Sequence, residues 1–198
     1  MIEQLVRQTR TVRRFHQDRP LDPAMLHRLI DLARLGGSAR NAQVLKYTVV
    51  TDGRLCGQLF PLLGWAGYLR DWPGPAEGER PPAYIVCLLD NELLKGPQTE
   101  AHFDLGIATQ NLLLGAAEQG VFGCRIGAFS AAAVQRLLQL SDRFTALLVV
   151  ALGYPAETVV LEEMGADGDI RYWHDEREVH HVPKRPLADL LVAPPEEA

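Results

Sequence analysis

The chain has 198 residues, with 20 Lys and Arg against 25 Asp and Glu, so its formal net charge is −5. Apolar residues make up 47% and charged residues 23%, which is typical of a globular protein and excludes a disordered chain. The acidic balance argues against a nucleic-acid-binding protein, and no apolar run approaches the roughly 18 residues that cross a bilayer. Three widely spaced cysteines and the lack of a secretory h-region favour a reducing compartment, so we expect a cytoplasmic protein.

In the first half of the chain, residues 2–9 have apolar side chains at helical spacing and predict a short helix. A second helix begins at the N-cap Asp22, with Pro23 at its first position, and ends at Gly36 and Gly37. The β-branched and aromatic stretch 47–51 predicts a strand that stops in a turn at Asp52 and Gly53.

In the second half, the elements alternate again between strands and helices. The remaining predictions are a Pro-rich loop at 71–82, a strand buried on both faces at 83–89, a long core helix at 103–119, a short strand at 124–126, a helix capped by Ser130, a strand at 146–152 and a short helix at 187–191. We therefore expect one α+β domain over residues 1–191, with a mixed sheet flanked by helices, and a flexible tail at 192–198.

Two basic pairs are candidates for binding an anion. Arg10 and Arg13 are three residues apart, so in a helix or tight turn they would share one face and could clamp an anion with bidentate contacts. The alternative is an ordinary solvated face. Lys184 and Arg185 form the second pair, and the sequence does not show whether the two pairs meet.

Two glycine-containing segments are candidates for close approach to a ligand. Residues 36–43 could read the edge of a heterocycle through Asn and Gln, or could be only a helix end and a turn. Residues 123–129 could expose backbone N–H groups at a strand–helix junction, or could be only a tight connection.

The sequence shows no recognisable pattern for metal binding, for nucleotide binding through a glycine-rich loop, or for catalysis by protein side chains. His174, His180 and His181 lack zinc-ligand spacing, so we expect an ordinary exposed loop and no metal. The sequence contains neither a dinucleotide-binding nor a P-loop fingerprint, and it has no defensible nucleophile–base or acid–base pair.

Taken in order, these segments resemble the FMN-dependent nitroreductase family. Residues 10–15, Arg-Thr-Val-Arg-Arg-Phe, are similar to its R-S-x-R-x-F opening, and residues 38–43 to its S-x-x-N-x-Q segment. Residues 104–114 match the D-x-G-x-A-x-Q-N-L-L-L of its central helix. Residues 153–155, Gly-Tyr-Pro, and 183–185, Pro-Lys-Arg, resemble the end of its last core strand and its C-terminal basic site.

This resemblance implies an intertwined homodimer with FMN at the interface. The implied cofactor contacts are Arg10, Thr11 and Arg13 on the phosphate, ribityl chain and ring edge, Ser38, Ala39 and Asn41 from the partner chain, backbone of Ile126 and Gly127 near flavin N5, and Lys184 and Arg185 on the phosphate. It also implies ping-pong hydride transfer from NADH or NADPH through N5 to a small electrophilic acceptor such as a nitroaromatic or quinone. The flavin would carry the chemistry, which agrees with the absence of a catalytic acid–base pair.

The sequence also departs from the family pattern. Val44 and Leu45 replace its Pro-Trp, and Gly36 and Gly37 stand where a small residue and a proline are usual. The segment 64–82, with Trp65, Tyr68 and Trp72 among its residues, matches no family pattern; these aromatics would stack on flavin or substrate, or pack on the protein surface. Two other functions remain open: a superfamily enzyme with another reaction, such as dehalogenation or ring breakdown, and a flavin-binding sensor or partner module without catalysis.

Overall fold

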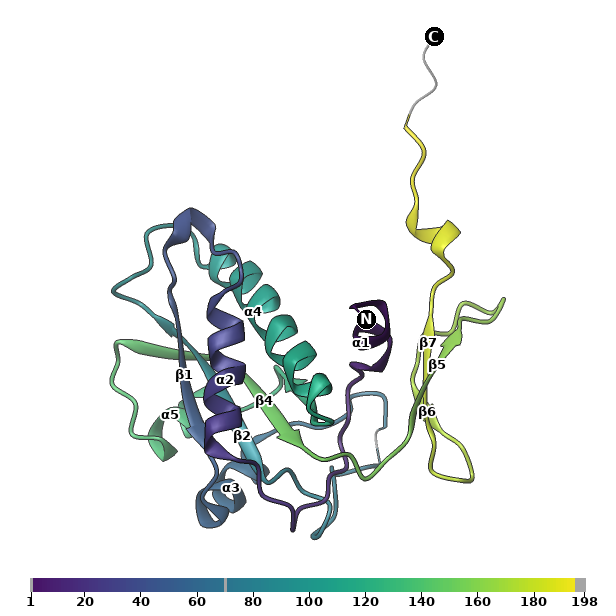
Figure 1. The fold of residues 1–198 in the computed structure, drawn as a ribbon, viewed down its shortest axis with the longest axis horizontal. Coiled ribbons are helices and arrows are strands. Elements are labelled where there is room, and N and C mark those ends of the chain that lie inside the picture. The colour runs from purple at the N-terminus through teal and green to yellow at the C-terminus, as the bar shows by residue number, and fades with distance from the viewer. Residues whose placement is uncertain (1, 70, 195–198) are drawn as a thin grey trace.

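The computed structural model describes residues 2–69 and 71–194 and confirms an α+β architecture (Figure 1). Its main sheet is antiparallel, in the order β1-β2-β4-β3. The strands are β1 (Leu45–Val50), β2 (Ala83–Asp90), β3 (Phe122–Ile126) and β4 (Phe144–Gly153). Every residue of β2 is buried, as the continuous apolar run predicts for a central strand.

Helices cover both faces of this sheet. One face packs against α2 (Pro23–Arg34) and α4 (Gln98–Glu118), and Ile85 and Cys87 of β2 point into that core. The other face packs against α3 (Gly53–Leu59) and α5 (Ala131–Leu137), and Tyr84 and Val86 point there. The alternation follows from the two-residue period of a strand.

Two local predictions have different outcomes. Asp22 caps α2, since its carboxylate accepts from Ala24 N at 2.9 Å, which confirms the predicted start. Asp52 was expected in a turn, but it caps α3 by accepting from Leu55 N. The sequence missed this helix because Asp-Gly is also a strong turn signal.

The long helix α4 differs from the expected core helix in length and in exposure. It begins at Gln98, five residues before the predicted start. Phe103 is 71% exposed and Ile107 44% exposed, so one side of α4 carries apolar residues that nothing in a single chain covers. The sequence does not reveal which side of the helix stays exposed, because apolar residues occur on nearly every side of it.

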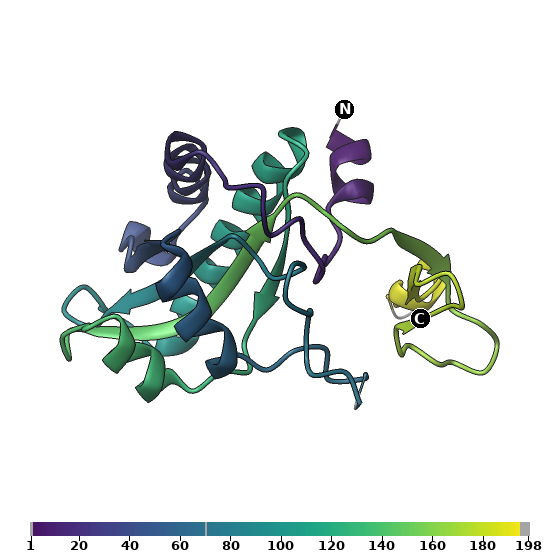
Figure 2. The same ribbon diagram turned by 90° about the horizontal axis from the view of Figure 1, so that it is seen from below.

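The two ends of the chain lie outside the layered body. The helix α1 (Ile2–Gln8) packs near the C-terminal end of α4, and residues 10–15 then run as extended chain. The C-terminal residues form a separate sheet in the order β5-β7-β6, which stands apart from the main sheet in both views (Figures 1 and 2).

The sequence did not reveal this C-terminal sheet. Its strands are β5 (Val159–Glu163), β6 (Trp173–His174) and β7 (His180–Lys184), and the predicted last helix is one 3₁₀ turn, η3 (Leu187–Leu190). Of the predicted tail, residues 192–194 are exposed and 195–198 lie outside the described residues. Among the described helices, none has both the length and the apolarity that a membrane span requires.

Candidate functional site

The N-terminal arginines lie on extended chain beside strand β3. Because α1 ends at Gln8, Arg10 and Arg13 do not share a helix face, and the expected one-face clamp is wrong in that form. Instead Thr11 forms a parallel bridge with Gly123, and Val12 N donates to Gly123 O at 3.1 Å. The segment therefore runs along the start of β3.

The guanidinium groups of this segment have buried donors without partners. Arg10 Nη2 donates to the carbonyl of Val6 at 2.6 Å, which folds the side chain back onto the end of α1. The Nε atoms of Arg10, Arg13 and Arg14 are buried and make no hydrogen bond within the described residues, although that of Arg14 lies 3.7 Å from a Glu79 carboxylate oxygen. Burial also lowers the pKa of Arg10. Unpaired, buried cationic donors are costly, so these atoms fit an anionic ligand that the chain itself does not supply.

The C-terminal end of β3 lies beside the loop that the family pattern does not explain. Ile126 is buried and Gly127 is exposed at the end of the strand. Gly64 N donates to Ala128 O at 2.6 Å, next to Gly127, so the segment 64–82 begins at this strand end. A Cβ on Gly127 would meet only Leu148, at 3.9 Å, so backbone here is open to a neighbour.

The loop at Ser38–Gln43 is fixed by one buried carboxylate of α4. Asp104 is 6% exposed and accepts from Ser38 Oγ at 2.7 Å and from Ala39 N at 2.9 Å. Ser38 Oγ in turn accepts from Gln43 N at 3.0 Å. In the sequence, Asp104 is notable only as the first residue of the helix motif at 104–114, and its role in fixing the loop follows from these tertiary contacts.

This loop holds three non-glycine residues in the left-handed region. Arg40, Asn41 and Gln43 have φ values of 53°, 52° and 50°. Such residues cost on the order of 1 kcal/mol each and persist where surrounding contacts hold them. Arg40 also makes a bidentate pair with Glu100, with both N–O distances at 2.8 Å. The expected turn is present. Its three left-handed residues and its contacts with Asp104 and Glu100 constrain it more than an ordinary helix end would need.

One chain does not bring these two groups of residues together. The loop sits on Asp104 near the start of α4, whereas α1 packs beside Ala117 near its end. At a rise of about 1.5 Å per residue, these positions are about 20 Å apart along α4. A ligand that contacts both the arginines and this loop therefore needs the loop of another chain.

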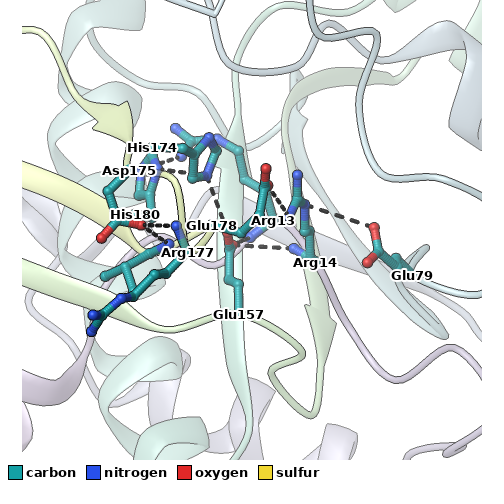
Figure 3. A network of polar contacts seen from close by, with 10 residues as sticks. Arg13, Arg14, Glu79, Glu157, His174, Asp175, Arg177, Glu178 and His180 are labelled. Atoms are coloured by element: carbon teal, nitrogen blue, oxygen red, sulfur yellow. Dashed lines mark hydrogen bonds and ion pairs between the residues drawn. The ribbon is translucent and has the colours of Figure 1, made fainter.

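The C-terminal sheet contacts the N-terminal arginines through a buried polar network (Figure 3). Glu157 Oε1 accepts from the backbone N–H groups of Arg13 and Arg14, the latter at 3.2 Å. Arg13 Nη1 lies 3.1 Å from His180 Nε2, and His180 Nδ1 lies 3.1 Å from His174 Nε2. The Arg13 guanidinium also stacks over Tyr172, 4.6 Å from the ring centre.

The histidines are not the exposed loop that the sequence predicted. His180 is 1% exposed on β7, and burial, followed by the charge of Arg13, lowers its pKa to about 4. His181 points to the opposite face of the strand, where it stacks on Trp173 with ring centres 4.2 Å apart. Hydrogen bonds to Glu162 and then Asp175 raise its pKa. Neighbours on one strand thus have opposite environments because β-strand side chains alternate.

Among the described residues, Glu157, His174 and His180 place one potential metal-ligand atom each within 4.8 Å of one another. A guanidinium only donates, so the Nε2 of His180 that faces Arg13 accepts and the proton sits on Nδ1. That proton occupies the nitrogen a metal would need. Metal-binding histidines normally donate their other N–H to an acceptor, and here the other nitrogen faces a cation. The donor set does not suit a metal.

The second basic pair lies further along β7. Lys184 ends the strand and Arg185 follows; both are exposed, and neither pairs with a carboxylate of the described chain. Four residues of strand separate Lys184 from His180, or about 13 Å. The strand therefore connects the Arg13 network with the second basic pair.

The aromatic residues of segment 64–82 pack on protein side chains. Trp65 lies against Phe60 with ring centres 5.5 Å apart, and Tyr68 lies 5.0 Å from Tyr172. Trp72 meets the edge of the His174 ring at 6.5 Å and lies beneath the Arg14 guanidinium. In a single chain, all three aromatic side chains therefore pack on the protein surface, as the second alternative expected. Tyr68 and Trp72 contact the C-terminal segment, at Tyr172 and His174.

Comparisons with known proteins confirm the resemblance to the nitroreductases. The model of the Nitroreductase family matches residues 90–154. A "Putative NADH dehydrogenase/NAD(P)H nitroreductase" of Methanothermobacter thermautotrophicus is 26% identical over 156 residues, covering 77% of this chain and 76% of that protein.

Solved structures show the same fold. A "putative nitroreductase in complex with FMN" from Desulfovibrio desulfuricans has a TM-score of 0.72 at 22% identity and covers 99% of this chain and 98% of its own. A nitroreductase family protein from Streptococcus pneumoniae has a TM-score of 0.67 at 20% identity, covering 80% of this chain and 92% of its own. The described chain therefore has the nitroreductase fold.

Proposed function

We propose that this chain, which has the nitroreductase fold and matches the nitroreductase family model in part, is an FMN-dependent NAD(P)H oxidoreductase acting as a homodimer. The observation that carries the proposal is the pair of buried, unpartnered guanidinium Nε atoms at Arg10 and Arg13. An FMN phosphate carries nearly two negative charges and accepts several such bonds.

The chain's own residues divide the task of holding the cofactor. Arg10, Thr11 and Arg13 lie along β3 and supply cationic and hydroxyl donors. Ile126 and Gly127 offer backbone at the end of the same strand, where no side chain of Gly127 blocks a flat ring. Lys184 and Arg185 add positive charge from β7.

Ser38, Ala39 and Asn41 complete the site from the partner chain. Their loop is about 20 Å away along α4 within one chain, so only a second copy can place them near the arginines. The exposed apolar side of α4, at Phe103 and Ile107, fits a surface buried between the two copies.

The C-terminal segment fits an intertwined form of this dimer. It leaves the body of the chain after β7 (Figure 1), and its large apolar side chains are exposed. Leu187 is 71% exposed and Val192 is 94% exposed, so burial against the partner would remove apolar surface from water.

FMN held by these residues would supply two-electron chemistry, that is, hydride transfer between NADH or NADPH and an acceptor such as a nitroaromatic or quinone. The protein binds the flavin and leaves one face accessible. No acid–base pair of the chain is required for this.

An absorption spectrum of the purified protein with added FMN, followed by anaerobic NADH or NADPH, tests the proposal. We expect about one FMN per chain and bleaching of the flavin band by the nicotinamide. The double variant Arg10→Ala/Arg13→Ala should lose FMN, whereas Arg7→Ala, on the exposed face of α1, should retain it. If FMN remains bound to the double variant, the assignment of Arg10 and Arg13 to the site is wrong. If bound FMN is not bleached by either nicotinamide, the proposed oxidoreductase activity is wrong.

A heterodimer tests whether the site is shared. Chains carrying Arg10→Ala/Arg13→Ala are co-expressed with chains carrying Ser38→Ala/Asn41→Ala, under two affinity tags. If each site takes residues from both chains, the mixed dimer keeps one intact site and binds about one FMN per dimer. If each chain builds its own site, the mixed dimer binds none.

A further inference from the structure

Strand β7 holds a histidine against one of the arginines assigned to the cofactor. His180 is 1% exposed, and its Nε2 lies 3.1 Å from Arg13 Nη1. Since Arg13 can only donate, His180 is the acceptor that fixes the direction of the guanidinium. The Tyr172 ring supports the same guanidinium from its face.

A second histidine sets the tautomer of the first. With Nε2 of His180 accepting, its Nδ1 carries the proton and donates to His174 Nε2 at 3.1 Å. The chain of bonds therefore runs in one direction, from Arg13 to His180 to His174. His174 lies on β6, which pairs with β7, so the C-terminal sheet holds both rings at the required spacing.

Glu157 holds the backbone of the same arginine. Its Oε1 accepts from the N–H groups of Arg13 and Arg14, just before β5 begins. Glu157 and His180 thus fix Arg13 at its backbone and at its side-chain tip. The Nε of Arg13 is left buried and unpartnered between these two points, which is the atom a ligand would find prepared.

We propose that His180, oriented by His174, is a positioning residue for Arg13 and sets the affinity of the flavin site through it. The inference rests on the proposed FMN site. A preorganised donor binds an anionic or carbonyl acceptor more tightly because the ordering cost is met before binding.

The decisive test is a double-mutant cycle on FMN affinity, measured by quenching of flavin fluorescence. His180→Phe keeps a buried ring against Tyr172 but removes the acceptor, and we expect FMN to bind about tenfold more weakly. His180→Gln restores an acceptor near the Nε2 position and should recover most of the affinity. On an Arg13→Ala background, His180→Phe should change the affinity no further, because its effect passes through Arg13.

The outcomes distinguish failure of the proposed function from failure of the role proposed for His180. If the wild type binds no FMN, the proposed function fails. If Arg13→Ala weakens binding and His180→Phe weakens it equally in both backgrounds, His180 is only structural and the inference is overturned. The same holds if His180→Phe has no effect at all.

A measurement without flavin keeps the inference testable in either case. In ¹⁵N-histidine NMR spectra of the full chain, His180 should be the neutral tautomer protonated at Nδ1. Protonation at Nε2 overturns the proposal, as does Zn²⁺ binding that His174→Ala and Glu157→Gln each abolish, because a metal would claim the Nδ1 lone pair.

Discussion

Replacing Asp104 tests whether the strained loop at Ser38–Gln43 is held by a single carboxylate. Asp104 accepts two hydrogen bonds from the loop, and bonds to a charged group contribute about 1.5–3 kcal/mol each. The three left-handed residues of the loop store about 3 kcal/mol, which relaxation would return. The two bonds together contribute about 3–6 kcal/mol, so for Asp104→Ala we expect a net stability loss of at most about 3 kcal/mol, together with loss of the loop conformation.

Two measurements on Asp104→Ala, unfolding stability and FMN affinity, should give different results. Urea unfolding should show the modest loss of stability; it is run at a fixed protomer concentration because the stability of the proposed dimer would depend on concentration. FMN titration should show at least a tenfold weaker affinity, since the partner's half of the site has lost its shape. Glu100→Ala is the matched control on the same helix: its pair with Arg40 is exposed and should contribute less than about 1 kcal/mol.

Two results would refute the reasoning. Unchanged FMN affinity in Asp104→Ala would mean that the loop does not belong to the site. A stability loss above about 4 kcal/mol would mean that the loop is unstrained and its bonds are not offset.

Three further predictions concern packing, assembly and pH. Gly123→Ala should destabilise the chain by about 1–3 kcal/mol in urea unfolding, because its Cβ would lie 2.5 Å from the backbone oxygen of Ala151; Gly127→Ala, with open space, should be close to neutral, and equal effects would contradict the packing argument. Phe103→Asp should shift the protein toward monomers in analytical ultracentrifugation and weaken FMN binding, whereas a retained dimer would exclude this side of α4 as the interface. The raised pKa of His181 means that the folded state favours its charged form, so its stabilisation is full below pH 6.5 and is lost as pH rises through the folded pKa. The difference in Tm between wild type and His181→Gln should therefore shrink from pH 6 to pH 9, and a difference that grows would refute the sign.

Elements whose signals are local can be predicted from the sequence alone. Asp22 followed by Pro23 marks the start of α2, because a cap depends only on residues one or two positions away. The apolar run of β2 and the Pro-rich loop before it are equally self-contained. The resemblance to the nitroreductases also came from short motifs in the correct order.

How these elements contact one another depends on long-range pairing, which local patterns do not encode. The burial of His180 depends on the parallel pairing of β7 with β5, whose residues lie about twenty positions earlier, and no local pattern encodes that pairing. The role of Asp104 depends on a loop more than sixty residues away. The separation of the loop from the arginines depends on the length of α4, so the reason to propose a second chain at the site appears only when the helix is placed between them.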